Sequence, residues 1–193
     1  NAWHDISHLS HLLFETSLIN NQIINQNQDF KIYLDKITNT FCFYITKVET
    51  RSNNNLNDSQ SYIKNLVNGL MKLFSGLKRI NYVPNLPFDR ILNIILKYHS
   101  QANACDFLNT FFVIDYCLEN ENNDYPEFIF AYLDKLINRI LSCYYYPDLG
   151  GFSFYKNSCQ YAIYYSNVAY KSNEPDIHGT TLLIWALSMI LEL

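Results

Sequence analysis

Two carboxylates in this sequence lie where an apolar helix is expected to begin, and such positions can place a titratable group at the mouth of a pocket. Asp176 and His178 come directly before the apolar stretch that starts at Gly179, and Asp106 lies early in the apolar stretch that starts at Ala102. A carboxylate and an imidazole brought close together in a partly dry site can exchange protons with a substrate. Asp176, His178 and Asp106 are therefore the predicted catalytic residues.

Each of these carboxylates also has a structural interpretation. Asp176 can cap its helix, because a carboxylate accepts hydrogen bonds from the free N–H groups of the first turn. Asp106 is costly to bury unless it is paired, so it either bonds to neighbouring backbone and Tyr hydroxyl groups or serves in chemistry. The sequence leaves both interpretations open.

Aromatic residues are concentrated just before the second of these helices, with ten of them between Tyr144 and Tyr170. Aromatic faces stabilise cations, and Tyr also fills cores, so the segment predicts either a lined apolar pocket or ordinary core packing. In the pocket interpretation the substrate-binding residues are Phe154, Tyr155, Tyr161, Tyr164, Tyr165 and Tyr170.

Metal and cofactor sites are not predicted. His4, His8 and His11 share one face of a helix, and three imidazoles can bind a metal, but no nearby carboxylate orients them. Cys159 lies in a polar loop without a His near it in the sequence, and the reactivity of a thiol depends on such a neighbour. We therefore expect no metal and no cofactor.

Composition excludes several classes of protein. The 193 residues are 49% hydrophobic and 16% aromatic, which indicates a folded chain, and the length favours a single domain over residues 1–193. The net charge is −4 and the basic residues are scattered, so nucleic acid is not an expected partner. The longest uncharged apolar segment, Gly179 to Leu191, is too short to cross a bilayer core of about 30 Å.

The cysteines and the N-terminus predict the compartment. The five cysteines are odd in number and mostly lie in apolar surroundings, which is typical of free thiols in a reducing compartment. The first residues contain neither the basic nor the apolar region of a secretory signal. We therefore expect a cytoplasmic protein without a transmembrane segment.

Apolar residues recur at helical spacing along most of the chain, which predicts an all-α fold. Helices that are apolar on one face alternate with helices that are apolar on almost every side, and this alternation indicates helical hairpins with an outer and an inner layer. The last helix is apolar on all sides, so it is expected to belong to the enclosed inner layer. The expected helices begin near residue 3, at Phe30, at Asn57 or Asp58 with a stop at Gly76, at Pro87, at Ala102, at Asp124, and at Pro175 or Asp176.

Extended backbone is expected only between the last two helices, from residue 150 to 174. Gly150 and Gly151 follow the expected helix end at Tyr146 and permit a positive φ or a close approach of the backbone. A linker of this length is longer than a plain helix connection and is a hint of function.

The stretch DLGGFSFY (148–155), followed by NEPDIHGTTLLIWALSMI (173–190), resembles the repeat unit of the terpenoid cyclase and protein prenyltransferase superfamily, the α/α toroids. In that superfamily an outer helix ends, a GGF-type turn follows, and an inner helix begins near an acidic residue or a His. The resemblance implies that this chain forms part of such a toroid, and the expected helices are fewer than a complete ring contains. Either half of the ring is missing from this sequence, or a protein partner supplies the remainder.

The resemblance also implies a function, an enzyme that handles an isoprenoid or another apolar small-molecule substrate. The sequence departs from the family's motifs, since it contains no DxDD, and Asp115 and Cys117 lie too late in their helix to match the prenyltransferase zinc site. Two alternatives are a catalytically silent toroid-like subunit that completes a partner's fold, and a protein that binds a small molecule without chemistry.

Overall fold

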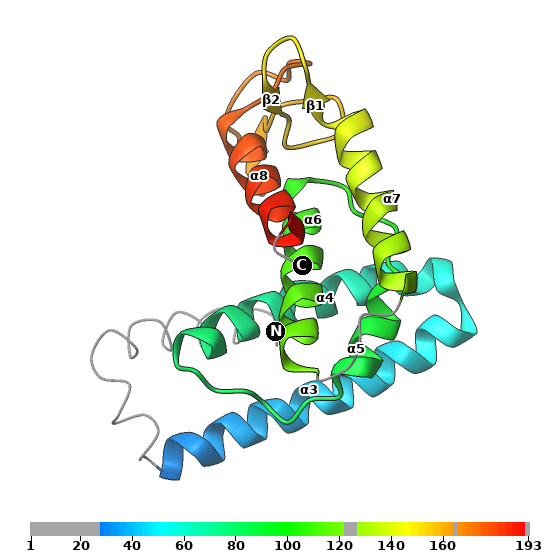
Figure 1. Cartoon of the computed structure of the whole chain (residues 1–193), viewed down its shortest axis with the longest axis vertical. Coiled ribbons are helices and arrows are strands. Elements are labelled where there is room, and N and C mark those ends of the chain that lie inside the picture. The colour runs from blue at the N-terminus through cyan, green and yellow to red at the C-terminus, as the bar shows by residue number, and fades with distance from the viewer. Residues whose placement is uncertain (1–27, 122–126, 164–165, 192–193) are drawn as a thin grey trace. The chain divides into compact units, whose positions relative to one another are not determined.

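The computed structural model of the chain describes residues 28–121, 127–163 and 166–191. Helices make up 69% of these residues, so the protein is all-α as predicted. The helix expected near residue 3 lies outside the described residues. The six described helices are α3 (Gln28–Asn54), α4 (Leu56–Arg79), α5 (Phe88–Ile95), α6 (Ala104–Asn120), α7 (Glu127–Cys143) and α8 (Ile177–Leu191) (Figure 1).

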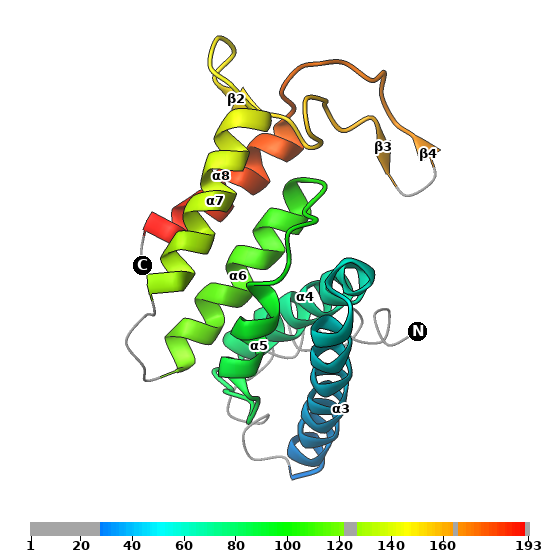
Figure 2. The same cartoon turned by 90° about the vertical axis from the view of Figure 1, so that its right-hand side faces the viewer.

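The strands form two short antiparallel hairpins in the stretch that joins α7 to α8. In the first, β1 (Tyr145–Tyr146) pairs with β2 (Gly151–Phe152), and in the second, β3 (Ala162–Ile163) pairs with β4 (Ser166–Asn167). Figure 2 shows the β3–β4 hairpin extending away from α7 and α8. The prediction of extended backbone between the last two helices is therefore confirmed, although α7 ends at Cys143 and leaves Tyr145 and Tyr146 to β1.

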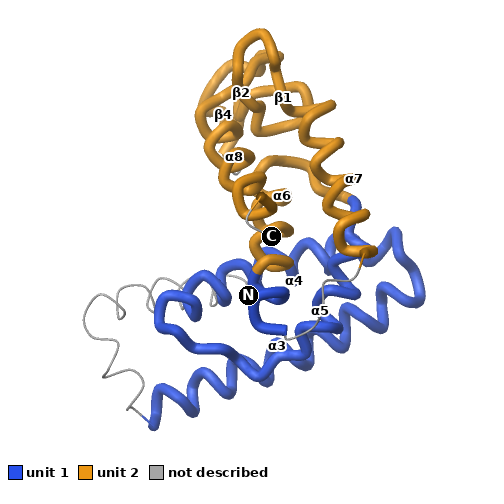
Figure 3. The backbone as a smooth tube through the Cα atoms, in the orientation of Figure 1, with its two compact units in different colours: residues 1–99, 116–122 blue, residues 100–115, 123–193 orange. Residues whose placement is uncertain are grey.

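The chain divides into two compact units, which Figure 3 shows in different colours. Unit 1 contains residues 1–99 and 116–122, and unit 2 contains residues 100–115 and 123–193. Helix α6 contributes to both, since its residues up to Asp115 belong to unit 2 and those from Tyr116 belong to unit 1.

In unit 1, helices α3, α4 and α5 contact one another. A single residue, Asn55, separates α3 from α4 and caps α4 by accepting hydrogen bonds from the N–H groups of Asn57 and Asp58. The predicted caps, Asn57 and Asp58, are therefore the donors and not the cap. The predicted stop at Gly76 is also wrong, because Gly76 is buried inside the helix, which continues to Arg79.

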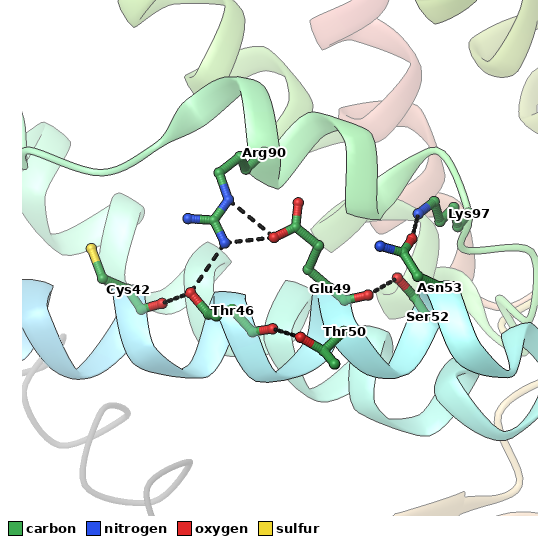
Figure 4. A network of polar contacts seen from close by, with 8 residues as sticks. All are labelled: Cys42, Thr46, Glu49, Thr50, Ser52, Asn53, Arg90 and Lys97. Atoms are coloured by element: carbon green, nitrogen blue, oxygen red, sulfur yellow. Dashed lines mark hydrogen bonds and ion pairs between the residues drawn. The ribbon is translucent and has the colours of Figure 1, made fainter.

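The core of unit 1 is aromatic at its centre. The ring of Phe74 stacks on Tyr116 with centroids 4.1 Å apart, and Phe88 packs edge-on against both. Gln60 on α4 forms hydrogen bonds with the residues that follow α5. Its side chain donates to the carbonyl of Lys97 and accepts from the N–H of His99. The surface of α3 is joined to the α5 region by polar contacts (Figure 4), of which Arg90 to Glu49 is an ion pair.

In unit 2, α6 is covered on all sides, as its sequence predicts. Residues on every side of the helix are buried, among them Ala104, Phe107, Leu108, Phe111, Val113 and Ile114. Helix α7 buries one face through Ile129, Leu133, Leu136 and Ile140. No helix in the described ranges is long and apolar enough to cross a membrane.

Candidate functional site

Asp176 caps α8 and at the same time binds the stretch that precedes it. Its Oδ1 accepts a hydrogen bond of 2.8 Å from the N–H of Gly179 in the first turn of α8. Its Oδ2 accepts from two backbone N–H groups outside the helix, those of Phe154 at 2.8 Å and Gln160 at 3.0 Å. One carboxylate therefore fixes the start of α8 and two points of the stretch between β2 and β3. We call this arrangement the Asp176 clasp.

Two glycines allow the clasp to close. A Cβ on Gly179 would overlap the backbone of Ser153 and Phe154, so only a glycine lets the extended chain lie directly on the helix. A Cβ on Gly151 would lie 3.0 Å from Cβ of Pro175 and 3.1 Å from the hydroxyl oxygen of Thr180. Gly150 has a φ of +65°, which glycine adopts without strain. The two roles predicted for the glycine pair, positive φ and close approach, are both confirmed.

The extended stretch from Phe152 to Phe154 joins the first turns of two helices. The Thr180 hydroxyl accepts from the N–H of Phe152 at 2.9 Å and lies 3.1 Å from its carbonyl oxygen. The carbonyl of Phe154 accepts a hydrogen bond of 2.8 Å from the N–H of Ala104, the first residue of α6. Phe154 therefore bonds to α6 through its carbonyl and to Asp176 through its N–H.

His178 is exposed and lies against the same stretch. Its Nδ1 is 2.6 Å from Oε1 of Gln160, which is hydrogen-bond distance. The imidazole stacks on Phe154 with centroids 5.0 Å apart. Phe154 therefore contacts both Asp176 and His178, whereas the hydrogen-bond partner of His178 is Gln160.

The predicted substrate-binding aromatics fall into three groups. Phe154, Tyr155 and Tyr161 form one cluster, with centroids 4.7 Å apart for the first pair and 5.3 Å for the second. Burial raises the pKa of Tyr155, and the neighbouring Tyr161 adds to the effect. Tyr170 is 96% exposed and lies outside that cluster. Tyr164 and Tyr165 lie outside the described residues.

Asp106 lies in the first turn of α6 and is almost fully buried. Its Oδ2 accepts from the N–H of Ala102 at 3.0 Å, and its own N–H donates to Oδ1 of Asn103 at 3.0 Å. Nearby, Arg139 donates to both the carbonyl and the side-chain oxygen of Gln101. Asp106 thus closes the turn that leads into α6.

The geometry bears on what these groups can do chemically. Each predicted acid accepts hydrogen bonds from backbone N–H groups, one for Asp106 and three for Asp176. No cluster of three or more His, Cys, Asp or Glu that could bind a metal occurs within the described ranges. His4, His8 and His11 lie outside those ranges.

Sequence reasoning missed Gln160, which donates to the clasp, and Thr180, whose hydroxyl bonds to Phe152. Thr180 carries a local signal, since it follows the capping residue on the same helix. No local signal in the sequence marks Gln160, because its contact with His178 spans 18 residues of an irregular segment.

Sequence reasoning also expected α8 to be enclosed on all sides, and this was wrong. Gly179, Leu183, Ala186 and Met189 form its buried face. The opposite face is exposed, and at 3.6 residues per turn its positions fall within an arc of about 120°. Its large apolar side chains are Ile177 (88% exposed), Ile184 (54%), Trp185 (45%) and Leu191 (88%). We call this face the α8 stripe, and Thr181 and Ser188 complete it.

No protein-family model, curated protein or solved structure matches this chain. The resemblance to α/α toroids stays a prediction from the sequence. A function has to be argued from the geometry of the clasp and the α8 stripe.

Proposed function

We propose that this protein is an interaction subunit, which binds a protein surface through the α8 stripe and carries out no chemistry of its own. The observation that carries the proposal is the exposure of Ile177, Ile184, Trp185 and Leu191 on one face of α8. Contiguous exposed apolar side chains on a folded protein are typical of interaction sites.

The chemistry of the α8 stripe supports an interface more than a solvated surface. A helix face in contact with water normally carries charged residues, and α8 contains no Asp, Glu, Lys or Arg. Depletion of charge and enrichment of Trp mark the buried centre of protein interfaces. By contrast, the exposed face of α3 includes Lys31, Asp35, Lys36 and Lys47.

The Asp176 clasp supports the same proposal because it fixes the helix that presents the stripe. Three hydrogen bonds to one carboxylate and the contact of Gly179 with the backbone of Ser153 hold the start of α8 in place. A surface that is held in its binding conformation loses little entropy when a partner binds. The predicted acids therefore have a structural role in this proposal.

The test is the composition of complexes that contain the full-length chain. The chain is purified from its own host, or expressed together with its neighbouring genes, and examined by native mass spectrometry and light scattering. We expect a complex of fixed stoichiometry that is lost in Trp185→Lys. Phe43→Lys is the matched control, because Phe43 is 74% exposed on α3 and lies outside the stripe. Circular dichroism establishes that both variants keep their helices.

The isoprenoid-handling enzyme is the second candidate, and the cluster of Phe154, Tyr155 and Tyr161 beside His178 favours it. The same native mass spectra distinguish the interaction subunit from the enzyme. A chain that carries one apolar small molecule and no protein partner would contradict the interaction proposal, and kinetics of His178→Ala would then be the next measurement.

A further inference from the structure

We draw no further inference here: the strongest candidate, the buried Cys159 thiol at the base of the β3–β4 hairpin, is a lone cysteine whose contacts with Ser172 and the carbonyl of Tyr170 are hydrogen bonds within the fold, and nothing else in the described part of the chain points to a ligand there.

Discussion

At the scale of single residues, Asp176 makes more contacts than its interpretation as a helix cap requires. The residue is a helix cap, but two of its three donors come from Phe154 and Gln160, well outside the helix. A local capping motif would involve only the first turn of α8. Asp176 therefore determines how a long irregular segment folds, in addition to where a helix begins.

We predict that Asp176→Ala lowers the free energy of unfolding by about 3 kcal/mol, because three backbone N–H groups lose a charged acceptor. Urea unfolding followed by circular dichroism measures this change. Asp134→Ala is the control, since Asp134 is exposed on α7, and its effect should stay within about 0.5 kcal/mol. A loss below about 1 kcal/mol in Asp176→Ala would show that water replaces the carboxylate easily.

Tyr144 presents the opposite case, a fully buried side chain whose hydroxyl oxygen has no hydrogen-bond partner in the described part of the chain. Its ring packs edge-on against Phe107 at 5.2 Å. We predict that Tyr144→Phe raises the free energy of unfolding at neutral pH by about 1 kcal/mol, since it removes an unsatisfied polar group and keeps the ring. The same urea titration measures it, with the exposed Tyr170→Phe as the neutral control.

The pH dependence of Tyr144 follows from its burial, which raises its pKa to about 12. In the unfolded chain the phenol ionises near pH 10, so between about pH 10 and about pH 12 the unfolded state releases a proton that the folded state keeps. The fold should therefore lose stability as the pH rises through this window. The Tyr144→Phe variant should lose less stability than the wild-type protein over this pH range. Equal losses of stability in the two proteins would contradict this explanation.

At the scale of elements, the chain at Ser153 and Phe154 lies so close to Gly179 on α8 that a Cβ there would be 2.4 Å from backbone atoms. We predict that Gly179→Ala lowers the free energy of unfolding by about 2 kcal/mol, although Ala favours a helix over Gly, because the new Cβ displaces the backbone of Ser153. Thermal unfolding measures the change.

Gly69→Ala is the matched control for that prediction. Its Cβ would lie 3.5 Å from ring atoms of Phe41, an ordinary contact, so this variant should gain about 0.5 to 1 kcal/mol from helix propensity. Equal effects of the two substitutions would contradict the close approach at Gly179.

The sequence predicted helices and turns well wherever their signal comes from residues that are close together in the chain. The 3.6-residue period identified α3, α4, α6 and α7, and the glycine pair identified the turn at residues 150–151. The errors arose where tertiary packing competes with a local signal. Gly76 has the chemistry of a helix end, but it is buried within α4, where packing keeps the helix continuous to Arg79.

The candidate site was predictable only in part, for the same reason. Asp176 was identifiable because a capping residue lies next to its helix in the sequence. The contact between His178 and Gln160 and the exposure of the α8 stripe depend on how distant segments pack, and an apolar helix has the same sequence pattern whether a core or a partner covers it.

At the scale of the whole molecule, an uncharged stripe makes a specific prediction about salt. Raising NaCl from about 0.1 to about 1 M should leave the association of α8 unchanged or make it slightly tighter, because salt screens only contacts between charges. Sedimentation at several salt concentrations measures this. A complex that dissociates as the salt rises would instead place the contact on charged side chains elsewhere in the chain.

The position of Phe154 has a consequence for how the folding of unit 2 can be followed. Its carbonyl group bonds to the first residue of α6, and its amide hydrogen bonds to Asp176 at the start of α8. Its peptide groups therefore connect the starts of two helices, at Ala104 and Asp176, which are 72 positions apart in the chain. Hydrogen–deuterium exchange at the Phe154 amide therefore reports the bond to Asp176 at the start of α8, and exchange at the Ala104 amide reports the bond to α6, without any label being introduced into the protein.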